Sequence, residues 1–135
     1  MTAYIATKFE NVDAFHEISK RLNDDLGITT VLDWTKHLPC KPFSDNMELC
    51  RTQAQEDIKA IQSSQIFIMY YDGTNKGSGM FLELGYAMAM MDMGAKADVI
   101  IFGKDVKNTS MFMHRDGITV LETLDEVIDI IKERM

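Results

Sequence analysis

The stretch IFIMYYDGTNKGSGMFLELGYAMAMMDM, residues 66–93, decides the fold of this chain. It opens with five apolar residues at 66–70, the pattern of a strand buried on both faces of a sheet. A polar, glycine-rich loop follows at 72–79. Residues 80–93 are apolar on nearly every side of a helix and hold five of the chain's 11 methionines. We therefore expect a strand, a loop and a helix that is buried on more than one side.

The alternation of strand and helix continues on both sides of this stretch. Asp45 with Glu48, and Thr123 with Glu126, resemble capping boxes at two helix starts. The expected elements are a strand at 4–7, a helix from the N-cap Asn11 to Gly27, a strand at 28–32, a loop at 33–43, a helix from Met47 through Ile61, strands at 99–102 and 118–121 joined by a loop at 103–117, and a last helix from Leu124.

This alternation predicts an α/β fold in which helices cover both faces of a parallel sheet. Right-handed crossovers leave few topologies, and we expect a flavodoxin-like three-layer sandwich with a five-stranded sheet in the order 2-1-3-4-5. The 135 residues are enough for one such domain, spanning 1–135. Ligands bind these sheets beyond the carboxyl ends of the strands, at the switch point between strands 1 and 3.

Composition excludes several classes of protein. Lys and Arg number 14 against 21 Asp and Glu, and the net charge of −7 disfavours a nucleic-acid groove or an anionic membrane surface. Cys40 and Cys50 form no C-x-x-C motif and have no histidine at metal spacing, so we expect neither a zinc site nor a secreted disulfide scaffold. Residues 1–7 do not resemble a signal peptide, and residues 80–93 are too few to cross a bilayer. We therefore expect a cytoplasmic protein.

Glu83 is the first candidate for chemistry. It is the only charged residue between Met80 and Met91 and lies about one turn from the start of the predicted helix. The positive partial charge of a helix N-terminus favours the ionised carboxylate there. A Glu that complements the helix dipole and reaches solvent is the alternative interpretation.

Asp57 is the second candidate, because it lies on or beside the apolar stripe of Ala54, Ile58 and Ile61. Burial at that position would raise the pKa of its carboxyl group, which suits a proton donor. The alternative is a solvated residue at the edge of the stripe.

Other polar residues gather at the predicted ligand edge. Residues 76–79, KGSG, could hold phosphate or sugar oxygens with backbone N–H groups, or form a plain tight turn. Trp34 follows strand 2 and could stack on a base or cover the sheet edge. His37 and His114 lie in loops at the same edge and are interpreted as solvated.

Three pieces of the chain, taken in order, resemble the nucleoside 2-deoxyribosyltransferase family. They are YIATKF at 4–9, Asp57 ahead of IQSSQI at 61–66, and GSGMFLELGYA at 77–87, which is the most specific. The resemblance covers almost the whole chain, and DWT at 33–35 also looks like a subgroup of small relatives. It implies a flavodoxin-like domain over 1–135 and a homo-oligomer, either a dimer or an assembly of dimers.

The resemblance also implies an activity, which is cleavage of the N-glycosidic bond of a 2′-deoxynucleoside or its 5′-monophosphate, with no metal or other cofactor. Glu83 would be the nucleophile at the anomeric carbon, Asp57 would protonate or orient the departing base, and Tyr4 would help to place the nucleophile. Two carboxylates in different environments suit this retaining chemistry. The residues expected to contact substrate are Thr7, Lys8, Trp34, Asp72, Gly77, Ser78, Gly79 and Asn108.

Two alternatives stay open. Transferases of the family often carry an Asp six positions before the nucleophile, where this chain has Gly77. An N-glycohydrolase that releases the base to water, without transfer, is therefore the first alternative. A non-catalytic nucleotide-binding module on the same fold is the second. Lys8 at the switch point favours a phosphorylated substrate.

Overall fold

The computed structural model describes residues 1–74, 78–95 and 98–135. Within these residues the strands form one sheet in the order β2-β1-β3-β4-β5, and every neighbouring pair is parallel. This confirms the predicted α/β fold and strand order. The strands are β1 (Thr2–Ala6), β2 (Thr29–Thr30), β3 (Ile66–Tyr70), β4 (Asp98–Phe102) and β5 (Ile118–Leu121). The helices are α1 (Val12–Leu26), α2 (Met47–Ser63), α3 (Ser78–Asp92) and α4 (Leu124–Arg134).

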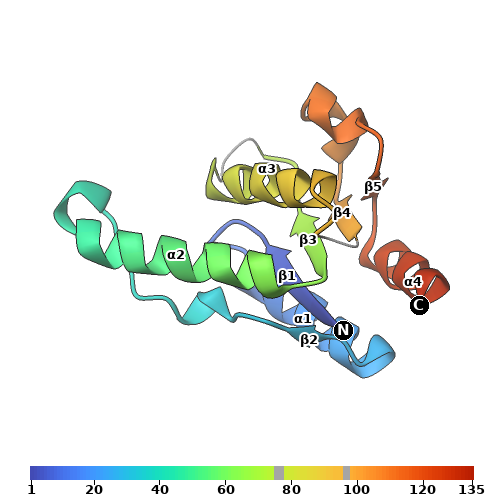
Figure 1. Ribbon diagram of the computed structural model, residues 1–135, viewed down its shortest axis with the longest axis horizontal. Helices are drawn as coiled ribbons and strands as arrows, with labels where there is room; N and C mark the ends of the chain where they lie inside the picture. Colours follow the sequence, from blue (N-terminus) through green and yellow to red (C-terminus); the bar gives the residue numbers. More distant parts are fainter. Residues whose placement is uncertain (75–77, 96–97) are drawn as a thin grey trace.

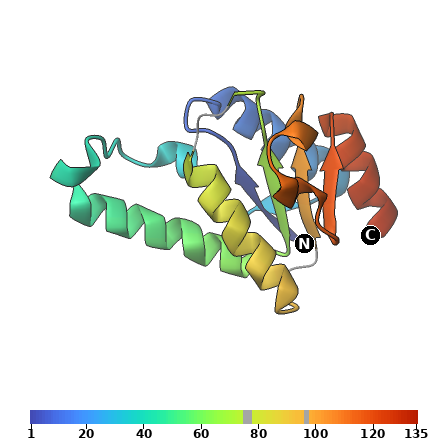
Figure 2. The ribbon, with the colours of Figure 1, turned by 90° about the horizontal axis from the view of Figure 1, so that it is seen from above.

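Helices cover both faces of the sheet, which gives three layers. α1 and α4 pack together on one face, and α2 and α3 pack together on the other (Figure 1, Figure 2). The central strands β1, β3 and β4 are almost entirely buried. Their side chains alternate between the two helix layers, so both sets must be apolar. This explains why these strands are continuous apolar runs in the sequence.

Strand β2 is shorter than the predicted 28–32. Only Thr29 and Thr30 pair with β1, although the amide of Val31 still donates to the carbonyl oxygen of Ala3 at 3.0 Å. The chain then leaves the sheet at Asp33, whose side chain accepts from the amide of Thr35 at 3.0 Å and begins the 3₁₀ turn η1 (Trp34–Lys36). This side-chain hydrogen bond competes with strand pairing and ends the edge strand.

Two of the three predicted helix caps differ from the caps in the structure. Thr123 and Glu126 form the expected capping box at α4. The box predicted at Asp45 and Glu48 is wrong, because Asp45 belongs to the 3₁₀ turn η2 (Phe43–Asp45) and Asn46 takes the N-cap position of α2. Asn11 is at the N-cap position of α1, but its side-chain amide donates to Asp72 at 3.2 Å instead of capping the helix.

Helix α3 is buried on one side only, which corrects the expectation of a helix enclosed on several sides. Met80, Leu84 and Ala87 pack against the core, whereas Leu82 is 77% exposed and Gly85 and Ala89 face solvent. The layer of helices on this face of the sheet is only one helix thick. Nothing within the described chain therefore covers the outer side of α3.

The first half of α2 and the segment before it project beyond the sheet, at the left of both ribbon views (Figure 1, Figure 2). We call residues 38–55 the arm. The apolar stripe predicted from Met47 onward is therefore buried only toward the end of the helix, at Ala60 and Ile61, while Met47 is 62% exposed and Ala54 is also exposed. Helical periodicity indicates an apolar face but does not show whether the sheet reaches it.

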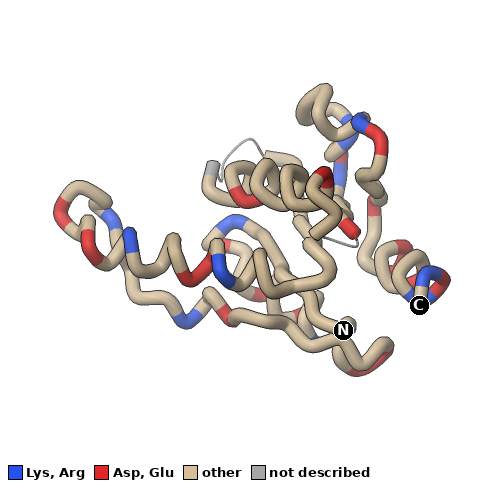
Figure 3. Tube along the Cα trace, viewed as in Figure 1, with Lys and Arg blue, Asp and Glu red and all other residues tan. Residues whose placement is uncertain are grey.

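In the described part of the chain, no helix combines the length and the apolar character that crossing a membrane requires. Lys and Arg are scattered among Asp and Glu over several elements (Figure 3). Such a distribution does not concentrate the positive charge that a polynucleotide backbone needs.

Candidate active site

Tyr4 and Glu83 meet between β1 and α3. Tyr4 lies in the third position of β1, is 0% exposed, and its ring stacks on Phe67 with centroids 5.9 Å apart. Its hydroxyl donates a hydrogen bond to Oε2 of Glu83. The strand and the stacked ring hold this hydroxyl in place, so Glu83 is held by a rigid donor.

The carboxyl group of Glu83 is difficult to ionise. Burial raises its pKa to about 7, the negative charge of Asp57 adds to the rise, and the bond from Tyr4 opposes it. We expected instead that the helix N-terminus would favour the ionised form. Because α3 begins at Ser78, Glu83 lies in its second turn, where the dipole effect has declined and burial dominates.

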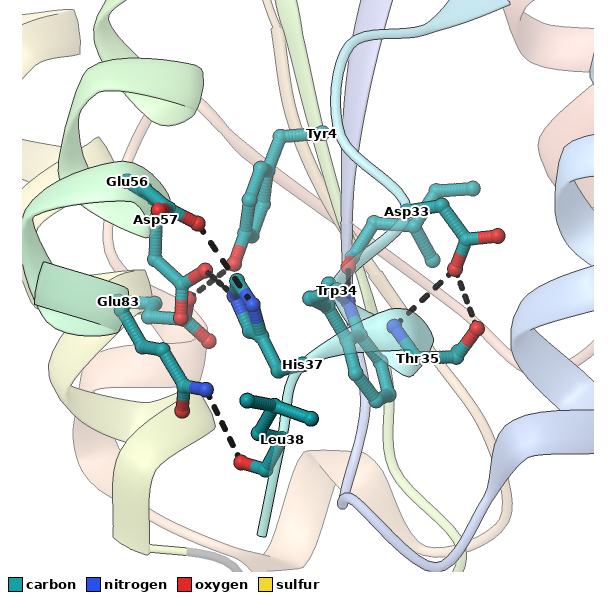
Figure 4. A network of polar contacts seen from close by, with 11 residues as sticks. Tyr4, Asp33, Trp34, Thr35, His37, Leu38, Glu56, Asp57 and Glu83 are labelled. Atoms are coloured by element: carbon teal, nitrogen blue, oxygen red, sulfur yellow. Dashed lines mark hydrogen bonds and ion pairs between the residues drawn. The ribbon is translucent and has the colours of Figure 1, made fainter. Parts of the chain in front are cut away.

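Asp57 faces the same space from α2. Its Oδ1 lies 2.9 Å from Nε2 of His37, and its side chain is 27% exposed. Burial raises the pKa of Asp57, while the hydrogen bond and charge of His37 oppose the rise. Asp57 is thus partly buried, and its pKa is raised rather than that of a fully solvated carboxyl group. Figure 4 shows Tyr4, Asp57, Glu83 and His37 pointing toward one another.

His37 is the residue that sequence reasoning missed, because we interpreted it as a solvated loop residue. Its side chain is only 14% exposed, and its Nδ1 lies 3.7 Å from Glu56, so the ring lies between two carboxyl groups (Figure 4). The loop that carries it runs back along α2, where the side-chain amide of Gln53 donates to the carbonyl oxygen of Leu38 at 2.9 Å. The one available signal was its position beyond the carboxyl end of β2.

Lys8 and Asp72 join the ends of β1 and β3 by a buried ion pair of 2.9 Å, with Lys8 only 7% exposed. Lys8 also donates to Thr74, and Asn11 donates to Asp72. Burial favours the neutral form of Asp72, but the bonds from Lys8, Thr74 and Asn11 outweigh it and hold its pKa well below the usual value. The charge of Lys8 is thus balanced within the protein by Asp72. The expectation that Lys8 favours a phosphorylated substrate takes no account of this ion pair.

Thr7 and Trp34 use their polar groups inside the protein. Thr7 is 7% exposed and donates to the carbonyl oxygen of Lys8 at 2.7 Å. Trp34 is 6% exposed, donates from Nε1 to the carbonyl oxygen of Ile5 at 2.7 Å, and packs edge-on against Phe15. Of the two interpretations of Trp34, these contacts favour covering the sheet edge.

The remaining candidate residues lie apart from the cluster of Tyr4, Asp57 and Glu83, or they fall outside the residues that the structure describes. Gly77 is outside the described residues, as is the side chain of Ser78, while Gly79 lies exposed in the first turn of α3. Asn108 is exposed in the 3₁₀ turn η3 (Val106–Asn108), which follows β4 and packs against β5. Over residues 1–74, 78–95 and 98–135, no group of three or more His, Cys, Asp or Glu is placed to hold a metal ion.

The fold is that of a solved 2-deoxyribosyltransferase. That enzyme comes from Bacillus psychrosaccharolyticus and is described as a biocatalyst for the synthesis of nucleosides. The likeness has a TM-score of 0.68 and covers 96% of this chain and 91% of the enzyme, with 20% sequence identity. No protein-family model and no curated protein matches the chain.

At 20% identity the likeness to the deoxyribosyltransferase concerns the fold. The chemistry of this chain has to be argued from its own residues. β1, α2, α3 and the loop before α2 bring together a phenol, two carboxyl groups of raised pKa and the imidazole of His37. Such a set can supply a nucleophile and, separately, a proton donor.

Proposed function

We propose that this protein cleaves the N-glycosidic bond of a 2′-deoxynucleoside or its 5′-monophosphate and transfers the deoxyribosyl group to a second base. The observation that carries the proposal is the pairing of Glu83 with Asp57, two partly buried carboxyl groups of raised pKa that face each other from neighbouring helices. The deoxyribosyltransferase fold and the sequence resemblance at Tyr4, Asp57 and Glu83 support it.

In the first step, the ionised carboxylate of Glu83 attacks the anomeric carbon, and the bond from that carbon to the base nitrogen breaks. Asp57 gives a proton to the departing base, which leaves neutral. The hydroxyl of Tyr4, held by β1, fixes the orientation of the attacking carboxylate. The product of this step is a deoxyribosyl ester on Glu83.

In the second step, a nitrogen of another base attacks the same carbon and releases Glu83, while Asp57 takes up the proton of the incoming base. Configuration at the anomeric carbon is retained because each of the two displacements at that carbon inverts it. If water takes the place of the second base, the protein is the hydrolase alternative. The Gly at position 77, where transferases often carry Asp, is the feature that keeps that alternative in the test.

The contacts of His37 extend this proposal. Its bond to Asp57 opposes the effect of burial on the Asp57 pKa, so His37 sets how readily Asp57 gives up its proton. We assign it as a positioning residue for the proton donor. The burial of Lys8 against Asp72 leaves a nucleoside as well supported as a monophosphate.

The test is to incubate the purified protein with a 2′-deoxynucleoside and a different free base, then to separate the products by chromatography. A new nucleoside supports transfer, release of base without a new nucleoside supports the hydrolase, and binding with neither product supports the non-catalytic module. Glu83→Gln should lower the rate on the order of 10³-fold or more. Glu17→Gln, an exposed carboxylate on α1, is the matched control and should leave the rate unchanged.

We also propose that the protein is cytoplasmic and that copies of it associate. In a single chain, α3 and the arm expose large apolar side chains to solvent. They are Leu82 on α3 and Leu38, Phe43 and Met47 on the arm. Both elements border the Glu83–Asp57 cluster, so a second copy seated there would bury these side chains and close the site from solvent.

A further inference from the structure

The two cysteines of this chain lie together in the arm. The thiol of Cys50, in the first turn of α2, donates to the carbonyl oxygen of Cys40 at 3.7 Å, and both residues are half-buried. Burial and a hydrogen bond with the Cys40 thiol raise the pKa of Cys50. The Cys50 sulfur therefore lies directly against the backbone of Cys40, although the two cysteines are ten positions apart along the chain.

These cysteines continue a series of contacts between α2 and the loop that precedes it. Asp57 contacts His37, Gln53 contacts Leu38, and Cys50 contacts Cys40. The three helix residues are four and three positions apart, so they share one face of α2. The loop runs antiparallel to the helix along that face. Cys40 and Cys50 thus hold the outer end of the contact series whose inner end is the His37–Asp57 pair.

We propose that Cys40 and Cys50 form a reversible disulfide by exchange with a low-molecular-weight disulfide, and that this bond fastens the loop carrying His37 to α2. The inference does not depend on the proposed function, because it concerns the thiols and the stability of the arm.

The exchange balances in two steps. The thiolate of one cysteine attacks a sulfur of the small disulfide, so that a mixed disulfide forms and one small thiolate leaves. The second cysteine loses its proton and attacks the protein sulfur of the mixed disulfide, which forms the Cys40–Cys50 bond and releases the other small thiolate. Two protein thiols are oxidised and one small disulfide is reduced to two thiols. Because the Cys50 thiol is hard to ionise, the exchange should be faster at alkaline pH.

The native chain is incubated with mixtures of oxidised and reduced glutathione, trapped by acid, and analysed by mass spectrometry. The expected product is a monomeric chain lighter by two hydrogen atoms, restored by dithiothreitol. Cleavage at Asp45 or Glu48, between the two cysteines, should leave the fragments joined until they are reduced. Cys40→Ser and Cys50→Ser should each keep one glutathione, because the second thiol needed to expel it is absent.

The stability of the arm is the second measurement. The oxidised chain should unfold at a temperature higher than the reduced chain by on the order of 5 °C, because the bond closes a short loop in the unfolded state. Stable glutathione adducts on both cysteines of the native chain, or disulfide-linked dimers in place of the internal bond, would overturn the proposal. An unchanged unfolding temperature in the oxidised chain would overturn the fastening of the loop.

Discussion

At the scale of single residues, the protonation state of Glu83 affects both the stability of the fold and the proposed activity. Its pKa is about 7 in the folded chain against the ordinary value of 4.5, so between these limits the folded state holds a proton that the unfolded state has lost. Stability from this group is therefore full below about pH 4.5 and is lost as pH rises through about 7, a change of about 3 kcal/mol. The proposed nucleophile needs the opposite form, so its activity should decline as pH falls below about 7.

Glu83→Gln separates the two effects. The neutral amide has no charge to desolvate, so the variant should be more stable than the native chain near pH 8 and should lose this advantage near pH 5. Urea unfolding at both pH values measures the difference, with Glu17→Gln as control. Equal stability of Glu83→Gln and the native chain near pH 8 would show that Glu83 is not desolvated.

His37 can be tested through the titration of its neighbour. His37→Phe keeps an aromatic ring over Asp57 but removes the nitrogen that lowers the carboxyl pKa. The midpoint of Asp57 in a carbon-13 NMR titration should therefore move to higher pH. His16→Ala, an exposed histidine on α1, should leave it in place. A midpoint that stays or moves down in His37→Phe would contradict the role that we assign to His37.

At the scale of elements, the junction of β3 and β4 depends on one glycine. Gly103 follows β4 with φ of 137°, and a Cβ there would lie 1.9 Å from the carbonyl oxygen of Tyr71, just after β3. Backbone atoms cannot move aside as a flexible side chain can. Gly103→Ala should therefore destabilise the chain by at least about 2 kcal/mol.

The matched control for Gly103 is Gly85, inside α3, where a Cβ meets nothing within 4 Å. Gly85→Ala should stabilise the protein by about 0.5–1 kcal/mol, because alanine favours a helix interior. Denaturant unfolding of both variants measures the contrast. A Gly103→Ala chain as stable as the native one would mean that the two strand ends are not in close contact.

At the scale of the whole molecule, the exposed side of α3 predicts association. Leu82 is 77% exposed on α3, the helix that also carries Glu83, so a partner that covers this side of α3 would lie next to the site. We expect the native chain to sediment as a dimer or a larger even-numbered assembly, and Leu82→Glu to shift it toward the monomer. Circular dichroism checks that Leu82→Glu remains folded. A native chain that stays monomeric at high concentration would contradict this prediction.

Local pattern was enough to predict the order of the elements. Continuous apolar runs such as Ile66–Tyr70 indicate strands with helices on both faces, and right-handed crossovers then leave few topologies, which include the observed order 2-1-3-4-5. The errors lie where neighbours compete with pattern. β2 ends early because Asp33 caps a turn, and the stripe of α2 is exposed at Met47 because the sheet does not extend that far.

The sequence by itself determined the fold and the order of its strands and helices, and it singled out Tyr4, Asp57 and Glu83 as candidates for chemistry, because each of these depends on local apolar pattern or on a short motif. Only the tertiary structure decided that His37 contacts Asp57, that Lys8 is balanced by Asp72, and that burial rather than the helix dipole governs Glu83. These properties depend on distance and desolvation between segments far apart in the chain, and such quantities exist only once the chain has folded.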